Sequence, residues 1–267
     1  ITHGALEGLF TVDEERGLNG AMSVSQEWLN GRIMLNLDSE DIGVFSIGCA
    51  GGRDTNLELA VERTAAKGDT TLKIFMHGLR GGHSGIDIHE GRGNAVKILN
   101  QLLYRLNLTV DFQLATFFGG DKHNAIPREA FAEIIVDARK KSDVENFVES
   151  FVQALEVEYN PVEKNIACSV EAIADASMAP LTEDGKNQLI ALVATLPHGV
   201  MSMSRTIKDL VETSNNVAAL RCEESVFKFL TSSRSSNMDS LQEVLDRIVN
   251  MAKLAGADVN QPPGYPG

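Results

Sequence analysis

The chain has 267 residues, which is enough for one large domain or two small ones. Its 37 acidic and 24 basic residues give a formal net charge of −13. This charge argues against nucleic acid and anionic membrane surfaces as the main partner, because both repel an acidic protein. Hydrophobic residues make up 43% and charged residues 23%, as in folded chains, and no apolar run is long enough to span a bilayer.

Cysteine usage and the two ends of the chain indicate its context. Cys49, Cys168 and Cys222 lie far apart and form no CxxC pair. Free thiols are typical of a reducing compartment, so we expect a cytoplasmic protein. The chain starts at Ile1 rather than Met and stops within the turn-rich run 262–267. We therefore interpret it as an internal piece of a longer protein.

The first fifty residues predict a β-α-β arrangement. Residues 5–12 form a short apolar run typical of a buried strand, residues 17–25 have a helical pattern, and residues 32–38 predict a second strand. Two strands joined by a helix prefer to run parallel, so both are expected to end at the same edge of one sheet. Residues 1–50 therefore predict part of an α/β domain.

The remainder of the chain predicts a different, α+β architecture. Within residues 51–258 the order β-α-β-β-α occurs twice, at about 70–158 and 166–255. We expect two antiparallel sheets with helices on one face. Residues 259–267 follow as a linker.

Capping signals mark the expected helix starts in these halves. Ser142 and Glu145 form a capping-box pattern, and Thr182 precedes a second helix. Ser236 opens the last helix, whose apolar stripe over 241–252 is assigned to the core.

Acidic residues follow each strand of the β-α-β segment. Glu14 and Glu15 stand where the first strand ends, and Asp38 where the second ends. Ligand sites in open α/β sheets collect at the carboxyl ends of strands, and carboxylates bind Zn²⁺, Mn²⁺ or Mg²⁺ through oxygen. One glutamate could bind a metal while the other acts as general base. The alternative is a solvated acidic loop.

Three further positions place polar groups in connections of the α+β region. The Gly-rich run 78–85 would present His83 outward, although a loop histidine with a structural partner is equally consistent. Asn124 joins two strands, where the alternative is an ordinary turn. Arg234 ends a strand just before a helix, where it could bind a substrate carboxylate through two hydrogen bonds. The alternative is an ordinary solvated arginine at the surface.

Five motifs, taken in order, resemble those of the cytosolic aminoacyl-histidine (Xaa-His) dipeptidases. These enzymes belong to the two-zinc aminopeptidase and carboxypeptidase clan, which also contains carnosinases. The resemblance covers essentially the whole chain. The motifs are TVDEERGLNG at 11–20, LNLDSED at 35–41, GLRGGHSG at 78–85, HNAIPREA at 123–130 and SSRSS at 232–236.

The resemblance implies a metal centre. Glu14 would be the general base, while Glu15 and Asp38 would each bind one of two zinc ions, for which Mn²⁺ or Co²⁺ could substitute. Residues 1–50 would then be part of a parallel-sheet metallopeptidase catalytic domain.

The resemblance also implies a lid over residues 51–258, which would form a homodimer, and a return linker over 259–267. His83 would help to hold the substrate carbonyl oxygen as charge develops on it. Asn124 and Arg234 would contact the dipeptide, with Arg234 at its terminal carboxylate.

The chain also departs from the family pattern. The family uses an upstream His-x-Asp motif, an Asp that bridges the metals and a His near the C-terminus, and this sequence contains none of them. A catalytic zinc usually needs about three protein ligands. We therefore expect the 267-residue chain by itself to be inactive and to bind zinc weakly.

The sequence thus predicts that the whole protein is a cytoplasmic zinc dipeptidase that hydrolyses Xaa-His and related dipeptides. Two alternatives stay open. One is a non-catalytic lid or dimerisation module, and the other is the same fold acting on N-acyl amino acids or tripeptides.

Overall fold

The computed structural model describes residues 2–13, 19–35, 42–43 and 48–267. The chain divides into two compact units, Ile1–Ile47 and Gly48–Gly267. Each is described by itself. Among the described residues, no helix combines the length and the apolar character that crossing a membrane requires.

The described part of the first unit contains short helical turns and no strand. They are the α-helix α1 (Asn19–Met22) and the 3₁₀ helix η2 (Gln26–Trp28). Residues 5–12 form no strand, and Leu6 and Phe10 are exposed. The predicted β-α-β arrangement is therefore not seen in the described residues. Buried parallel strands need partners alongside and cover on both faces, and this part of the unit supplies neither.

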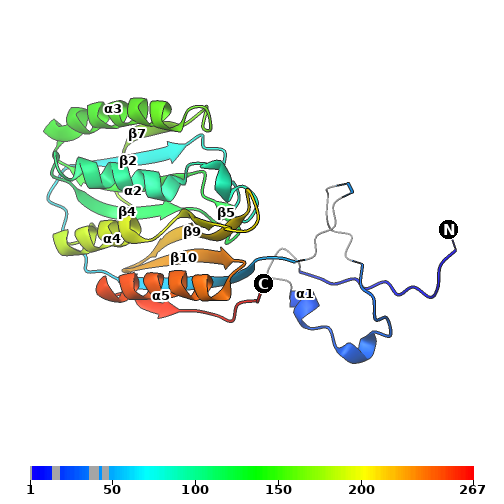
Figure 1. The fold of residues 1–267 in the computed structure, drawn as a ribbon. Helices are drawn as coiled ribbons and strands as arrows, with labels where there is room; N and C mark the ends of the chain where they lie inside the picture. The colour runs from blue at the N-terminus through cyan, green and yellow to red at the C-terminus, as the bar shows by residue number, and fades with distance from the viewer. Residues whose placement is uncertain (1, 14–18, 36–41, 44–47) are drawn as a thin grey trace. The chain divides into compact units, whose positions relative to one another are not determined.

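The second unit is a layer of helices packed on one antiparallel sheet (Figure 1). Its strands are β1 (Gly51–Ala60), β2 (Thr70–His77), β3 (Gly82–His83), β4 (Gln113–Gly119), β5 (Ala125–Ile126), β6 (Ala130–Val136), β7 (Ala167–Ile173), β8 (Gly199–Met203), β9 (Val211–Glu223), β10 (Val226–Ser235) and β11 (Asp258–Asn260). Its helices are α2 (Ala95–Leu106), α3 (Lys141–Tyr159), α4 (Glu183–Thr195) and α5 (Met238–Leu254), with the 3₁₀ turns η3 (Ile88–Glu90) and η4 (Ala138–Lys140).

The sheet runs without interruption in the order β11-β1-β10-β9-β4-β6-β2-β7, and β8 pairs with β9 beside this path. β3 and β5 form a separate two-stranded ribbon. The expectation of two sheets is therefore wrong. The two central strands, β4 and β9, join through the pair Gly119 and Leu220, which makes a single sheet of the two halves.

Each half of this sheet has the β-α-β-β-α-β order and the strand arrangement of a ferredoxin-like fold. The first half runs β2, α2, β4, β6, α3, β7, and the second runs β1, α4, β9, β10, α5, β11. The first half is thus inserted between β1 and α4 of the second.

The sequence order had indicated that the strand over 167–173 opens the second half. It instead pairs with β2 and therefore belongs to the first half. Sequence order alone could not reveal this, because sheet neighbours are chosen by pairing across the fold. The two connections of the insertion lie side by side, since Arg63 and Leu181 form a β-bridge.

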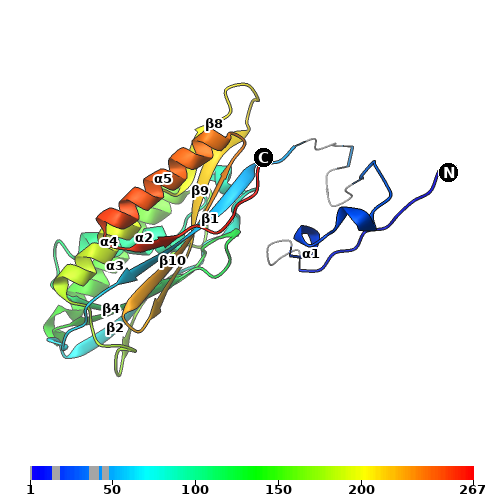
Figure 2. The ribbon, with the colours of Figure 1, turned by 90° about the horizontal axis from the view of Figure 1, so that it is seen from below.

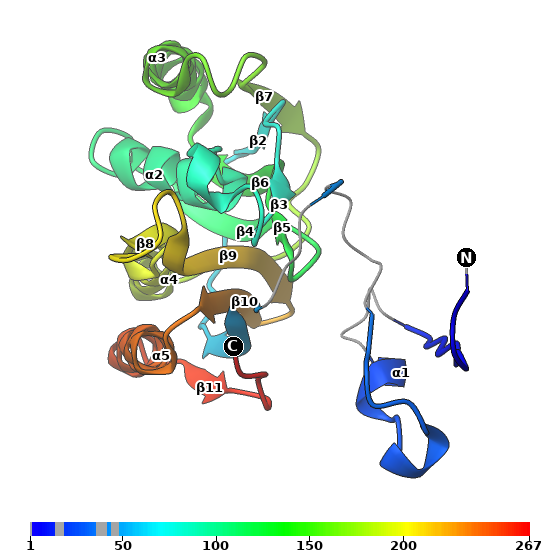
Figure 3. The same ribbon diagram turned by 45° about the vertical axis from the view of Figure 1, so that its right-hand side comes forward.

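The core lies between the sheet and the four long helices, which all cover the same face (Figure 2). Apolar residues alternate along β2 with less buried ones, and Leu72, Ile74 and Met76 are fully buried. The apolar stripe predicted over 241–252 is buried in α5, and α2 buries an apolar stripe of its own. Figure 3 shows α2 and α4 side by side over the join between the halves.

Helix caps agree with the sequence at one place and differ at two. Thr182 caps α4 by accepting a hydrogen bond from the Gly185 N–H, as predicted. The prediction of a capping box at Ser142 is wrong, because α3 begins at Lys141 and Ser142 already lies inside it. The side-chain cap is provided earlier, by Asp137 at the start of η4. α5 is capped by Asn237 rather than by the preceding serine.

Candidate functional site

The loops that carry His83 and Asn124 are held together by main-chain pairing. In the β3–β5 ribbon, Gly82 stands opposite Ile126 and His83 opposite Ala125. The Ser84 N–H extends the pairing by donating to the Asn124 carbonyl at 2.7 Å. Two loops separated by some forty residues in the sequence therefore present their polar residues at one place.

The backbone of the first loop requires glycine. Gly82 has φ +140°, and a Cβ atom there would stand 2.0 Å from Nη1 of Arg92. That guanidinium holds the loop by donating to the Gly81 carbonyl at 2.7 Å and to Asp87 at 3.0 Å. Its hydrogen bond to the Glu90 side chain lowers the pKa of that carboxyl. The Gly-rich run is thus a tightly fixed support for the histidine that follows it.

The orientation and tautomer of His83 follow from its own loop. Its Nδ1 accepts hydrogen bonds from the backbone N–H groups of Gly85 and Ile86, at 3.2 and 3.1 Å. The backbone N–H of His83 donates to the Asp87 carboxylate at 2.8 Å. Because Nδ1 accepts twice, the neutral ring carries its proton on Nε2. This nitrogen is therefore a hydrogen-bond donor, as stabilising a developing oxyanion requires.

Arg234 reaches the same place from the second half. It lies on β10, opposite Gly52 of β1. A Cβ atom at Gly85 would stand 3.3 Å from Cζ of Arg234, so the guanidinium packs directly on the His83 loop. Its Nη1 donates to the hydroxyl of Tyr265 at 3.1 Å. The structure thus brings together His83, Asn124 and Arg234, which the sequence analysis selected independently.

Three buried polar atoms at this site have no hydrogen-bond partner within the described part of the chain. They are Nε of Arg234, Oγ of Ser84 and Oδ1 of Asn216. Asn216 is fixed there because its amide donates to the Ala125 carbonyl at 2.7 Å. A buried polar group without a partner costs about 1–3 kcal/mol. Such a cluster marks a place where further polar groups would be bound favourably.

Sequence reasoning missed two members of this site. Asn216 is buried in the middle of β9, and Tyr265 lies in the C-terminal segment. The polar run 212–216, which directly precedes the apolar residues 217–220 of β9, could have indicated Asn216. Its neighbour Asn215 is structural, since its side chain bonds both the Pro197 carbonyl and Ser233. No comparable signal pointed to Tyr265.

A cavity of about 810 Å³ adjoins the β3–β5 ribbon. His83 and Asn124 are among the residues that line it. Its aromatic lining comes from three adjacent strands of the first half, through Phe75, Phe118 and Phe131. The last two rings stack with centroids 5.5 Å apart. The cavity thus combines aromatic and polar lining residues, a combination typical of small-molecule sites.

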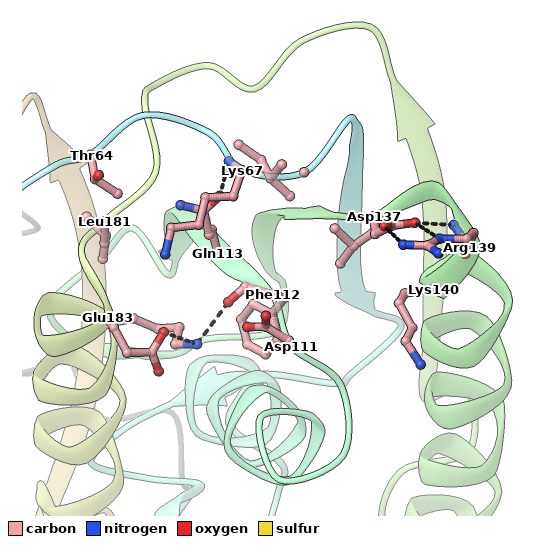
Figure 4. Close-up of a pocket in the computed structure, with 14 residues that line it drawn as sticks. Thr64, Lys67, Asp111, Phe112, Gln113, Asp137, Arg139, Lys140, Leu181 and Glu183 are labelled. Atoms are coloured by element: carbon pink, nitrogen blue, oxygen red, sulfur yellow. Dashed lines mark hydrogen bonds and ion pairs between the residues drawn. The ribbon is translucent and has the colours of Figure 1, made fainter.

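A second cavity, of about 600 Å³, opens at the opposite ends of β4 and β6 (Figure 4). Lys186 in its wall is buried and donates to the carbonyl of Phe112 at 2.8 Å and to Asn107 at 2.7 Å. Arg139 is bound by Asp137, and this hydrogen bond lowers the pKa of the Asp137 carboxyl. Because these cations are already paired, this cavity is a weaker candidate for ligand binding.

The predicted metal-binding residues cannot be placed. Glu14, Glu15 and Asp38 all lie outside the described residues. Within residues 2–13, 19–35, 42–43 and 48–267, no group of three or more His, Cys, Asp or Glu side chains is arranged to hold a metal ion. The described residues therefore do not by themselves fit a metal centre.

Residues 76–163 match the family described as Peptidase dimerisation domain. The whole chain is 37% identical over 268 residues to the cytosol non-specific dipeptidase of Escherichia coli strain K12, of which it covers 55%. It also matches the crystal structure of aminoacylhistidine dipeptidase from Vibrio alginolyticus with a TM-score of 0.84 and 35% identity, over 96% of this chain and 53% of that one.

These similarities confirm the resemblance to aminoacyl-histidine dipeptidases that the motifs indicated. The chain spans about half the length of these two relatives.

Proposed function

We propose that the whole protein is a metal-dependent dipeptidase that hydrolyses Xaa-His and related dipeptides, and that the second unit supplies its substrate-binding lid. The observation that carries this proposal is the meeting of His83 and Arg234 at Gly85. His83 donates through Nε2 of its imidazole ring. Arg234 is a cation whose buried Nε has no acceptor in the described part of the chain. The pair matches the carbonyl oxygen and the terminal carboxylate of a dipeptide.

Each lid residue then has a distinct part in the reaction. Arg234 binds the carboxylate and fixes the register of the dipeptide. His83 donates from Nε2 to the carbonyl oxygen, where negative charge develops during attack by water. Asn124, which lies beside His83 through the β3–β5 ribbon, provides a further polar contact to the peptide. The aromatic cavity next to these groups gives the side chains of the substrate an apolar surface.

The catalytic residues of the first unit remain proposals from the family resemblance. We propose Glu14 as the general base and Glu15 and Asp38 as ligands of zinc, with Mn²⁺ or Co²⁺ as the other metals to be tested. When bound, such a metal activates water and polarises the scissile carbonyl. The name of the Escherichia coli relative and the three free cysteines support a cytoplasmic location.

The decisive experiment uses the full-length parent protein with Glu14→Gln. Zinc content should be retained while hydrolysis of a Xaa-His dipeptide falls by at least about a hundredfold, as expected when a general base is lost. Unchanged turnover would remove Glu14 from this role. Substrate choice is tested in parallel with N-acetyl-histidine and a tripeptide. Preference for either of these would favour the alternative substrates.

A second candidate function is supported by the match to a dimerisation domain, since the lid could also mediate self-association. Within this chain, α2 packs on α4 and β4 joins β9, so these surfaces are already occupied. A homodimer through the lid therefore uses other faces, such as the outer strands β7 and β11. Because His83 meets Arg234 of its own chain, we propose that it acts in its own subunit. Gel filtration of the full-length protein tests the dimer, and a strict monomer would contradict it.

A further inference from the structure

Tyr265 is the only described side chain that forms a hydrogen bond with the Arg234 guanidinium. Its hydroxyl accepts from Nη1 at 3.1 Å. The backbone of Tyr265 is fixed at the same place, because Gly52 donates to its carbonyl at 3.0 Å and accepts from its N–H at 2.9 Å. Gly52 is also the residue opposite Arg234 in the β1–β10 ladder. Tyrosine and arginine are therefore held to a common strand residue.

Glycine at position 52 is what allows this arrangement. A Cβ atom there would stand 2.6 Å from Oη and 2.7 Å from Cζ of Tyr265. Any side chain at this position would push the phenol away from its present place. The ring therefore lies across the backbone of Gly52, and its hydroxyl is directed to the guanidinium.

We infer that Tyr265 is a positioning residue for Arg234, which it orients to receive the terminal carboxylate of the substrate. This inference rests on the proposed function of Arg234. A carboxylate binds arginine best through two parallel N–H donors on one edge of the guanidinium. Nη1 of Arg234 already donates to Tyr265, so the edge formed by Nε and Nη2 is the one left for the substrate carboxylate. Nε is the buried donor that lacks an acceptor among the described residues.

A hydroxyl acceptor suits this task better than a carboxylate would. An ion pair to Asp or Glu would neutralise Arg234 and compete with the substrate. The phenol restricts rotation of the guanidinium and leaves its positive charge intact. In the described structure Arg234 forms no ion pair. Its charge is thus available for a ligand, while its orientation is set by a neutral neighbour.

The test is Tyr265→Phe in the full-length protein, which removes the hydroxyl and keeps the ring on Gly52. We expect KM for a Xaa-His dipeptide to rise about five- to tenfold, the effect of one lost hydrogen bond, with kcat within twofold. The preference for the free acid over the dipeptide amide should fall by the same factor. On an Arg234→Ala background, Tyr265→Phe should have no further effect.

The matched control is Tyr104→Phe on α2, an exposed tyrosine whose hydroxyl makes no hydrogen bond in the described structure. It should leave KM, kcat and the acid-to-amide preference unchanged. Equal losses on acid and amide, or additive effects with Arg234→Ala, would show that Tyr265 is merely structural and overturn the inference. Activity of Tyr265→Phe equal to that of the parent would overturn it too.

Failure of the proposed function has a different signature, namely a parent protein that hydrolyses no dipeptide. Calorimetric titration with L-histidine, which is not hydrolysed, then tests Tyr265 independently of turnover. Weaker binding by Tyr265→Phe, with normal binding by Tyr104→Phe, supports the inference. Equal affinities, or no binding by the parent, overturn it.

Discussion

Gly85 of the first half lies directly against Arg234 of the second, and a Cβ atom at Gly85 would stand 3.3 Å from its Cζ. The same atom would stand 3.0 Å from Cε1 of His83. This contact joins two residues almost 150 positions apart, and it exists because the two halves share one sheet. The candidate site is therefore a product of the join between the halves.

The first prediction uses this contact directly. Gly85→Ala places a methyl group between His83 and Arg234, and we expect it to raise KM for a dipeptide in the full-length protein about three- to tenfold by displacing one or both side chains. Gly85 does not have positive φ, so the fold should be little affected. Gly48→Ala, whose added methyl group would meet no described atom within 4 Å, is the control. Steady-state kinetics give KM for both variants, and thermal unfolding shows whether each one is folded. Equal KM values for Gly85→Ala and Gly48→Ala would contradict the expectation.

The two arginines that precede the last helix of each half should differ in function. Arg234→Ala should raise KM for a dipeptide at least about tenfold, because a charge-assisted hydrogen bond to the substrate is lost. Arg139→Ala should change KM less than twofold, since Arg139 is exposed and bound to Asp137. Steady-state kinetics with a dipeptide that has a free terminal carboxylate measure KM for both variants. A comparable loss in the two variants would mean that neither arginine is specific to the site.

Stability should depend on pH through His198. Burial lowers its pKa to about 4, and the nearby charge of Lys97 acts in the same direction. The unfolded chain, with a pKa near 6.5, then binds more protons than the folded one between these values, so stability falls as the pH falls from about 6.5 to about 4. Between pH 7 and pH 5 the expected loss is about 2 kcal/mol. Urea unfolding at both pH values measures it, and His198→Gln should reduce the difference.

The 267-residue chain should bind zinc weakly. Only Glu15 and Asp38 are proposed ligands, and the described residues offer no group of three that could complete a site. A calorimetric titration with zinc chloride should give no tight binding, and Glu15→Gln should change the isotherm little. Tight binding of two ions per chain would show that further ligands exist in the sequence and would overturn this prediction.

The sequence alone determined the elements of the second unit where local periodicity is strong. The buried alternation of β2 and the apolar stripes of α2 and α5 are properties of neighbouring residues, so they could be read along the chain. The sequence also singled out His83, Asn124 and Arg234 as candidates, because the motifs that contain them can be recognised from their order along the chain.

Only the tertiary structure decided how the elements are joined. Strand pairing across the fold places β1 with the second half and β7 with the first, and it makes one sheet from two halves. Pairing between distant segments depends on contacts that no local pattern encodes. For the same reason Asn216 and Tyr265 became members of the site only when β9 and the C-terminal segment were seen beside the loops of the first half.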